Sequence, residues 1–565
     1  MEKSMEQYTP KRKTEVWGHL DDGSIEVTYN KLAHKLSPLA SYVFEHCNGR
    51  YTVNEIVNKA VKNGKLSSKI IEKSEISNAD VLESLASLKN DDLIILNYNS
   101  LHSATEYNSS AIYPIAAVNH PVDILFVSPP SPLPYAHRED MKLEPLGLGY
   151  MSSYLKSFGF SVGIIDSWVR QLNLETIYNF INRHSPKIVG ITTKTVNFEN
   201  GVIIADAVKK VSPDTIIIFG GYHVTFLDEE ALAKNDSIDI IVRGEGEHTI
   251  VDLANYFLRN IGDLSKIDGI TMRRNNKIIR TKERALICDL DTLPFPDRLS
   301  LDDTRVGVAV SVQTSRGCPS KCVFCAARGL SGGRYRQRSA ENIISEIEFL
   351  LSKGVKSIFF QDDTITADIK RLQRFLCLIE DKGIKFRWNA ESRVDALEKD
   401  LSIIKRMVNA GCVGLQFGIE SGSQAILDSI NKNITIKQIH KTLTATTKEC
   451  IDVRCSFIIG HPQETLETMK ETINLAKDII NLGALSMLAI ACPFPGSDIY
   501  KQPEYYGLNI HHYDYSNYSP QLAIMDTAFL TAKQLKKYHY EYVIELNRHL
   551  RQYRFQNLFQ RTLTN

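Results

Sequence analysis

Five short apolar runs between residues 357 and 491 restrict the fold of this chain more than any other feature. They are SIFFQ, FRWNA, VGLQFGI, RCSFIIG and LSMLAIA. Charged segments with the period of a helix separate them, and one of these, AENIISEIEFLLSKG, ends on a glycine, which is a helix stop signal. Short strands that alternate with helices predict βαβ units in a parallel sheet. An apolar run at residues 306–312 predicts one more strand in front of them.

A loop with three cysteines follows that first strand. Cys318, Cys322 and Cys325 stand within QTSRGCPSKCVFCAARG, and the other 10 − 3 = 7 cysteines are spread along the chain. Thiolates favour zinc or iron–sulfur clusters. A structural zinc site would need a fourth ligand, and the nearest cysteines are Cys288 and Cys377. Three cysteines on a four-iron cluster instead leave one iron open, which suits a catalyst. Structural zinc and a chance grouping of core cysteines are the alternatives.

The loop resembles the signature of radical S-adenosylmethionine (SAM) enzymes, including an aromatic residue, Phe324, before the third cysteine. The resemblance implies that the three cysteines hold a [4Fe-4S] cluster, and that SAM chelates its open iron and is cleaved reductively to a 5′-deoxyadenosyl radical. It also implies that the six predicted strands form a (β/α)6 partial TIM barrel, with the active site at the strand ends.

The same resemblance assigns roles to polar residues at these strand ends. The residues expected to contact SAM are Asp362 and Asp363 (amino group), Arg393 (carboxylate), Glu420 and Ser421 (methionyl or ribose portion) and Gly460 in GHPQET (adenine). Acidic residues after strands are often helix caps, so a cap is the alternative role for Asp362 or Asp363.

Upstream of the cysteine loop, from Pro121, the pattern predicts a doubly wound domain. Five apolar runs alternate with helical segments, which indicates a Rossmann-like sheet in flavodoxin order. The runs are DILFVSPP, VGIID, KIVGITT, TIIIFGGYH and IDIIVRGEGE. The first strand-to-helix turn lacks the G-x-G-x-x-G pattern, so the sequence disfavours NAD and FAD.

The fragments PLGLGYMSSYL, GGYHVT and VRGEGE resemble the cobalamin-binding domain that precedes the barrel in a large radical SAM subclass. The resemblance implies methylcobalamin as a further cofactor. The expected contacts are Gly220, Gly221, His223, Gly244 and Glu245, with glycines where the backbone must approach a ligand closely. A D-x-H-x-x-G motif is missing, which suggests cobalt without a protein histidine ligand. We therefore expect His223 to hydrogen-bond to corrin side chains or to the backbone.

The first hundred residues predict a small winged-helix-like α+β domain. Residues 16–29 alternate as a β-hairpin, and three helix-period segments follow, the last of them over residues 78–96. The net charge of this region, 13 − 14 = −1, gives little support for nucleic-acid binding. The order of elements resembles the PqqD-like leader-peptide recognition domain of the pyrroloquinoline quinone pathway. That resemblance implies a ribosomally made precursor peptide bound by strand addition. A purely structural extension is the alternative.

The expected domains are residues 1–100 (peptide recognition), 121–260 (cobalamin), 301–500 (radical SAM) and 501–565 (a C-terminal helical extension). No apolar run is long enough to cross a bilayer and the N-terminus has no signal-peptide core, which predicts a cytoplasmic protein without a membrane partner. With 67 basic and 66 acidic residues, the whole chain has no charge bias toward nucleic acid. The tyrosines after residue 510 could line a substrate entrance, but packing is the preferred interpretation.

Together these features predict a cobalamin-dependent radical SAM methyltransferase that acts on an unactivated carbon of a ribosomally synthesised peptide. The electrons would come from a reductant such as flavodoxin or ferredoxin. The alternatives are other outcomes with the same cofactors (cyclisation, rearrangement or epimerisation), methylation of a small metabolite, and a peptide- or DNA-binding regulator with a vestigial barrel.

Overall fold

The computed structural model describes residues 122–130, 145–167, 174–298, 310–449, 451–511 and 514–563, and upstream of them the backbone of five strands. The chain divides into two compact units, one of residues 1–111 with 536–545 and one of residues 112–535 with 546–565. Among the described residues, none of the helices has both the length and the apolar character needed to cross a membrane.

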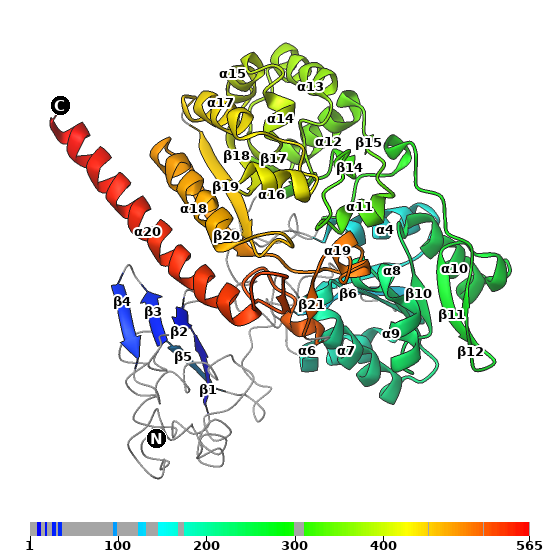
Figure 1. The fold of residues 1–565 in the computed structure, drawn as a ribbon. Coiled ribbons are helices and arrows are strands. Elements are labelled where there is room, and N and C mark those ends of the chain that lie inside the picture. The colour runs from blue at the N-terminus through cyan, green and yellow to red at the C-terminus, as the bar shows by residue number, and fades with distance from the viewer. Residues whose placement is uncertain are drawn as a thin grey trace, which may run out of the picture. The chain divides into compact units, whose positions relative to one another are not determined.

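The first unit contains two small antiparallel sheets (Figure 1). Strand β1 (Tyr8–Arg12) pairs with β5 (Ile94–Tyr98). Strands β2 (Trp17–His19), β3 (Ile25–Tyr29) and β4 (Leu32–Leu36) form a three-stranded sheet in that order. The pairing of β2 with β3 confirms the predicted hairpin. Residues 94–96 correct the prediction of a helical segment to residue 96, because their pairing with β1 places them in a strand. The three predicted helices otherwise lie outside the described residues.

The second unit begins with a seven-stranded sheet in the order β12-β11-β10-β9-β8-β6-β7. Its strands are β6 (Ile124–Ser128), β7 (Val162–Asp166), β8 (Ile188–Thr192), β9 (Ile216–Gly220), β10 (Ile240–Val242), β11 (Ile270–Arg274) and β12 (Lys277–Arg280). The first five are parallel and follow the flavodoxin order, as predicted. A hairpin of β11 and β12 extends this sheet, because β11 pairs antiparallel with both β10 and β12.

Helices cover both faces of this sheet, which explains its apolar strands. In β6, Leu125 and Val127 belong to one buried cluster, and Ile124 and Phe126 belong to another. The first cluster includes residues of α6 (Leu174–His184) and α7 (Phe198–Val211), and the second includes residues of α4 (Leu146–Ser157) and α10 (Glu247–Arg259). Two shorter helices, α8 (Tyr222–Phe226) and α9 (Asp228–Lys234), follow β9.

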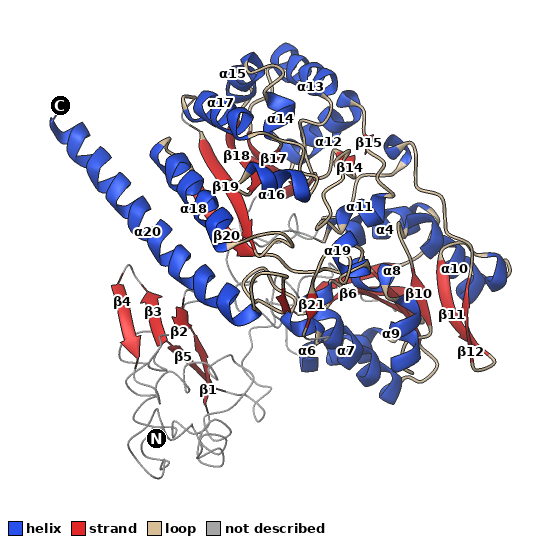
Figure 2. Cartoon of the chain, viewed as in Figure 1, coloured by secondary structure: helices blue, strands red, loops and turns tan. Residues whose placement is uncertain are grey.

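The second sheet has six parallel strands in sequence order. They are β13 (Val310–Val312), β16 (Ser357–Phe360), β17 (Arg387–Ser392), β18 (Cys412–Glu420), β19 (Asp452–Ile459) and β20 (Leu485–Ile490). Since β13 and β20 are not hydrogen-bonded to each other, the barrel is partial, as predicted. Buried and partly exposed residues alternate along β19, so its two faces differ in exposure, and Figure 2 shows helices beside the strands of this sheet.

Seven helices of the described structure accompany these strands, and two of them illustrate clear local start or stop signals. They are α12 (Ala340–Ser352), α13 (Ile369–Lys382), α14 (Val394–Leu397), α15 (Ser402–Asn409), α16 (Gln424–Ser429), α17 (Ile436–Thr447) and α18 (Leu466–Asn481). A capping box of Thr435 and Gln438 starts α17. Gly383, in the left-handed region at φ +61°, ends α13.

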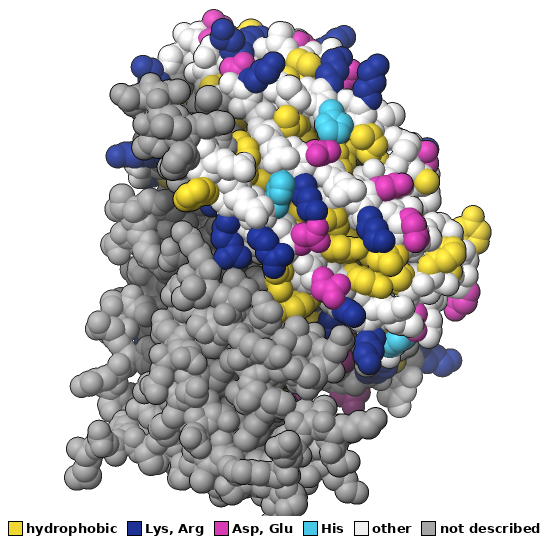
Figure 3. Space-filling view, turned by 60° about the vertical axis from the view of Figure 1, so that its left-hand side comes forward, with side chains coloured by type: hydrophobic (Ala, Val, Ile, Leu, Met, Phe, Trp, Pro, Cys, Tyr) yellow, Lys and Arg dark blue, Asp and Glu magenta, His cyan; other side chains and the backbone are white. Residues whose placement is uncertain are grey.

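The chain after the barrel returns to the cobalamin-type sheet. It contains α19 (Asp498–Lys501), β21 (Asn509–Ile510), β22 (Met525–Asp526) and α20 (Ala532–Leu563), the last of which confirms the predicted helix. Tyr515 and Tyr518 are buried and belong to the same apolar cluster as Phe198 and Phe219. This confirms packing for these two tyrosines. Figure 3 shows basic and acidic side chains interspersed on one face of the described structure.

Candidate active site

The cysteine loop follows β13 and is held by backbone hydrogen bonds on both sides. The N–H of Val323 donates to the carbonyl of Ile430 at 3.1 Å, and the Val323 carbonyl accepts from the N–H of Asp498 at 3.0 Å. Before the cysteines, β14 (Ser315–Arg316) pairs with β15 (Arg336–Gln337). The loop is therefore tied to three separate parts of the fold.

Gly317, directly before Cys318, is needed for the turn into the loop. Its φ is +85°, and a Cβ at this position would lie 2.2 Å from the carbonyl oxygen of Arg334. Only glycine fits both the left-handed conformation and this close approach.

The three thiols suit a cluster better than a single ion. Burial raises the pKa of Cys322, and it raises the pKa of Cys325 to about 11, so both thiols hold their protons until a metal displaces them. In a [4Fe-4S] cluster each cysteine thiolate binds its own iron, so three thiolates on one loop leave the fourth iron open. The donor set of the loop therefore fits the cluster.

Asp362 and Asp363 occupy different environments at the end of β16. Asp362 is buried, and its carboxylate accepts hydrogen bonds from the N–H of Thr314 (2.6 Å), from the N–H of Ser315 (3.0 Å) and from the Thr314 hydroxyl. Asp363 is exposed to solvent at one edge, yet neighbouring protein partly desolvates its carboxyl group; this desolvation and then the charge of Asp362 raise its pKa, against a hydrogen bond from the N–H of Gly317. Asp362 therefore supports the start of the cysteine loop through these hydrogen bonds, whereas Asp363 is accessible to a ligand.

Glu420, at the end of β18, takes a left-handed conformation with φ +69°. Its carboxylate forms a buried ion pair with Lys432, with Oε1 and Nζ 2.7 Å apart. The next residue, Ser421, is fully buried: its hydroxyl lies 3.0 Å from that of Thr472 and accepts the N–H of Ser423. Among the contacts seen here, Ser421 supports the turn into α16.

Arg393 lies at the start of α14 and is partly buried. Its guanidinium pairs with Asp395 at 2.9 Å and donates to the carbonyl of Lys432 at 3.0 Å. Its charge and that of Lys432 act on Cys322 and oppose the rise in the pKa of that thiol. The two cations are therefore placed to stabilise thiolates and a bound carboxylate.

Gly460 begins the loop after β19 with φ +86°. Its N–H and that of His461 donate to the carboxyl group of Glu464. The His461 ring is buried, its centroid is 5.5 Å from that of Phe324, and neither ring nitrogen has a hydrogen-bond partner among the described residues. Burial lowers the pKa of His461 to about 3, so the ring is neutral.

Sequence reasoning missed three polar residues at the site. The first is Glu391, whose pKa is raised to about 7 by burial, with a smaller effect from Asp363. It could have been found from its place on β17, two residues before Arg393. Lys432 stands in a turn and had no local signal. Tyr222, the first residue of α8, is half-exposed, and burial and then the charge of Asp363 raise the pKa of its hydroxyl.

The cobalamin-type domain presents backbone at the predicted positions. Gly221, after Gly220 at the end of β9, has φ +100°, and a Cβ there would lie 2.5 Å from the carbonyl oxygen of Thr193. Gly244, after β10, has φ +71°, with open space where a Cβ would stand. The open backbone at Gly244 fits a large ligand that must approach closely, whereas glycine at residue 221 is required by the packing of the domain itself.

His223 is buried between two aromatic rings. Its ring centroid lies 4.3 Å from that of Phe198 and 4.4 Å from that of Tyr515, and burial lowers its pKa to about 3. Its Nδ1 has no partner among the described residues. A neutral buried histidine with one unpaired nitrogen fits a hydrogen bond to a cofactor side chain, and its role stays a prediction.

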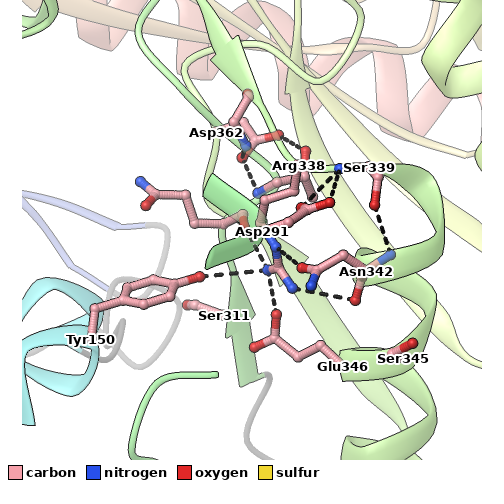
Figure 4. A network of polar contacts seen from close by, with 12 residues as sticks. Tyr150, Asp291, Ser311, Arg338, Ser339, Asn342, Ser345, Glu346 and Asp362 are labelled. Carbon is pink, nitrogen blue, oxygen red and sulfur yellow. Dashed lines mark hydrogen bonds and ion pairs between the residues drawn. The ribbon is translucent and has the colours of Figure 1, made fainter. Parts of the chain in front are cut away.

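Glu245 binds the barrel through arginines. Its carboxylate lies 2.9 Å from Arg316 and from Arg336, and accepts the N–H of Ile287 at 2.8 Å. Arg316 also pairs with Glu247 at 2.6 Å. A second contact appears in Figure 4, where the hydroxyl of Tyr150 on α4 points at Arg338, which pairs with the buried Glu346 of α12.

Comparison with known proteins agrees with this architecture. The Radical SAM superfamily profile matches residues 312–476, and the B12 binding domain profile matches residues 138–254. An uncharacterised methyltransferase of Pyrococcus horikoshii is 34% identical over 387 residues, which are 67% of this chain and 82% of that protein. The anaerobic magnesium-protoporphyrin IX monomethyl ester cyclase of Rubrivivax gelatinosus is 27% identical over 395 residues, 67% of this chain and 69% of the relative.

The fold is also similar to that of a solved structure, the cobalamin-dependent SAM radical enzyme OxsB with aqua-cobalamin and SAM bound. The TM-score is 0.63 at 17% identity, over 94% of this chain and 75% of that chain. The chain belongs to the cobalamin-dependent radical SAM methyltransferase family, and it is an enzyme whose cofactors are a [4Fe-4S] cluster, SAM and cobalamin.

Proposed function

We propose that this enzyme methylates an unactivated carbon of a ribosomally synthesised peptide. The observation that carries methyl transfer is the contact between the VRGEGE loop of the cobalamin domain and the cysteine loop. Glu245 and Arg316 join the two, and Arg316 stands two residues before Cys318. Tyr222 of the cobalamin domain is close enough to Asp363 and Cys325 for their charges to act on its hydroxyl. A methyl donor and a radical source at these places would share one cavity.

When bound, SAM and the reduced cluster would supply the radical chemistry for hydrogen abstraction from the substrate, and methylcobalamin would supply the methyl group. The residues of the chain bind and orient these groups. We assign Asp363 to the SAM amino group, Arg393 to its carboxylate and Glu420 to its methionyl or ribose portion. Asp362 and Ser421 hold the loops that carry the neighbouring groups. A reductant such as flavodoxin or ferredoxin provides electrons.

The peptide substrate is supported by the first compact unit, residues 1–111 with 536–545. The three-stranded antiparallel sheet in it has β2 and β4 as its edges. An edge strand can accept a further strand from an extended peptide through main-chain hydrogen bonds. We therefore propose that residues 1–100 form a PqqD-like domain that binds the leader of a precursor peptide, as in enzymes of ribosomal peptide biosynthesis.

A second candidate is favoured by the printed functions of relatives. One relative is a cyclase of magnesium-protoporphyrin IX monomethyl ester, and a Streptomyces wedmorensis relative is a methyltransferase of cytidylyl-2-hydroxyethylphosphonate. These substrates are small molecules. Methylation of a small metabolite, or another radical outcome such as cyclisation, is therefore the alternative.

The two candidates separate in one experiment. The anaerobically reconstituted protein is incubated with methyl-labelled SAM, cobalamin, a reductant and the precursor peptide encoded beside its gene. We expect the peptide to gain the mass of one labelled methyl group and 5′-deoxyadenosine to form. 5′-Deoxyadenosine without a methylated peptide would support the alternative, and failure to cleave SAM would contradict both.

A further inference from the structure

Four charged residues join the two cofactor domains at one place. Arg316 and Arg336 of the short β14–β15 ladder face Glu245 and Glu247, which stand around the start of α10. The side chains are between 5% and 13% exposed. We call these four residues the ionic clamp.

The ionic clamp sits between two segments that have little freedom. On the barrel side, Arg316 is followed by Gly317, whose backbone is packed against the carbonyl of Arg334, and then by Cys318. On the other side, Glu245 lies between Gly244 and Gly246, and also accepts the N–H of Ile287 from the segment that links the domains. A shift of either segment must therefore displace the other or break a buried ion pair.

Breaking one of these buried ion pairs is energetically unfavourable. Burial works against the charge of Glu245, but hydrogen bonds and charges from Arg336 and Arg316 outweigh it and hold its pKa below the ordinary value. A buried ion pair adds little net stability, yet removal of one partner leaves an uncompensated buried charge and is strongly destabilising. The clamp is therefore suited to fix geometry rather than to add stability.

We propose that the ionic clamp makes cobalamin binding and occupancy of the cluster site depend on each other. The proposal rests on the predicted contact of residues 244–246 with the corrin, and it concerns binding rather than methyl transfer. A bound cluster would fix the position of Cys318 and, through the ion pairs of Arg316, the position of the Glu245 loop. Cobalamin would then meet this loop in the position that the clamp imposes, whereas a shift of the empty cysteine loop would move it. Coupling of this kind is reciprocal, so cobalamin stabilises the cluster site in return.

The test compares cobalamin affinity with and without the cluster. Hydroxocobalamin is titrated by anaerobic equilibrium dialysis into reconstituted protein and into protein stripped of iron. We expect affinity about tenfold higher with the cluster, within the ordinary range of coupling. In a second measurement, bound cobalamin should slow the loss of cluster iron to a chelator. Equal affinities in the two forms would overturn the proposal.

Variants separate the clamp from general effects on folding. Arg316→Gln should bring the affinity ratio close to one, and Arg316→Lys should retain part of it, because one ammonium cannot bridge two carboxylates as a guanidinium does. If Arg316→Gln does not fold, Glu247→Gln removes one partner with little change of shape and should lower the ratio. Lys382→Gln, which breaks an exposed pair with Glu348 on the outer helices, is the matched control. An unchanged ratio in folded clamp variants would refute the coupling.

This readout requires neither substrate nor turnover. If the coupling is observed but the peptide is not methylated, the role of the ionic clamp stands and the proposed substrate is wrong. If the peptide is methylated but no coupling is observed, the proposed substrate stands and the role of the clamp is wrong.

Discussion

The barrel mouth and the facing edge of the cobalamin domain prepare their sites in opposite ways. Around the cysteines the barrel gathers charged side chains, among them Asp363, Glu420 and Lys432. The cobalamin domain offers glycine backbone at residues 221 and 244 and turns Glu245 toward the barrel. SAM is small and charged, so charges can orient it. A corrin is large, so close approach and shape matter more.

The largest expected effect lies on the barrel side, at the cysteines. Cys322→Ala should lose the cluster and reduce SAM cleavage at least about 10³-fold, since no SAM could then chelate an open iron. Iron content and 5′-deoxyadenosine formation measure this. Cys288→Ala, at an exposed cysteine between the domains, is the control and should keep both. Normal iron content in Cys322→Ala would contradict the assigned ligand set.

Asp362 and Asp363 allow structural support and ligand contact to be compared within the barrel itself. Asp362→Asn should lower the free energy of unfolding by about 3 kcal/mol, because a buried carboxylate that accepts three hydrogen bonds is replaced by an amide. Asp363→Asn should leave stability nearly unchanged and weaken SAM binding about tenfold. Thermal unfolding and equilibrium binding of SAM measure the two effects. Equal effects of both variants would remove the distinction between support and ligand contact.

The pH dependence of stability tests the buried carboxyl group of Glu464. Burial raises its pKa to about 8, against backbone hydrogen bonds from Gly460 and His461. A raised carboxyl pKa means that the folded chain binds the proton more tightly than the unfolded chain. The stability that this proton binding contributes is therefore complete below about pH 4.5 and is lost as the pH rises to about 8.

Glu464→Gln removes that titration. Relative to the parent protein, we expect the variant to gain stability by roughly 3 kcal/mol between pH 5 and pH 8. Denaturant unfolding at a series of pH values measures it, and parallel curves for the two proteins would disprove the assignment.

The smallest expected effects are on the cobalamin side, where the predicted contacts include glycines, whereas those of the barrel are charged side chains. Gly221→Ala should cost about 2 kcal/mol, since its φ is positive and its Cβ would meet the carbonyl of Thr193. Gly244→Ala meets no atom and should cost about 1 kcal/mol for the backbone conformation alone. It should nevertheless weaken hydroxocobalamin binding. Full affinity in Gly244→Ala would place the corrin away from this loop.

Much of the fold could be predicted because its signals are local. Strand runs, helix stops and glycine turns act over a few residues, so the two large sheets and the C-terminal helix follow from the pattern. Residues 94–96 show the limit, since their pairing with β1 depends on a strand more than eighty residues away. The roles of Asp362 and Asp363 could not be separated by sequence, because adjacent residues with the same side chain differ only in what surrounds them.

Residue types and their spacing were enough to identify the cysteine loop, the order of the two α/β domains and therefore the family and its cofactors. The folded structure was needed to show which carboxylates support loops, that Lys432 and Glu391 join the site, and that Glu245 pairs with Arg316 across the domain boundary. The physical reason is that ligand chemistry depends on residue type and spacing. Burial, charge pairing and pKa depend on neighbours that the chain brings together only when it folds.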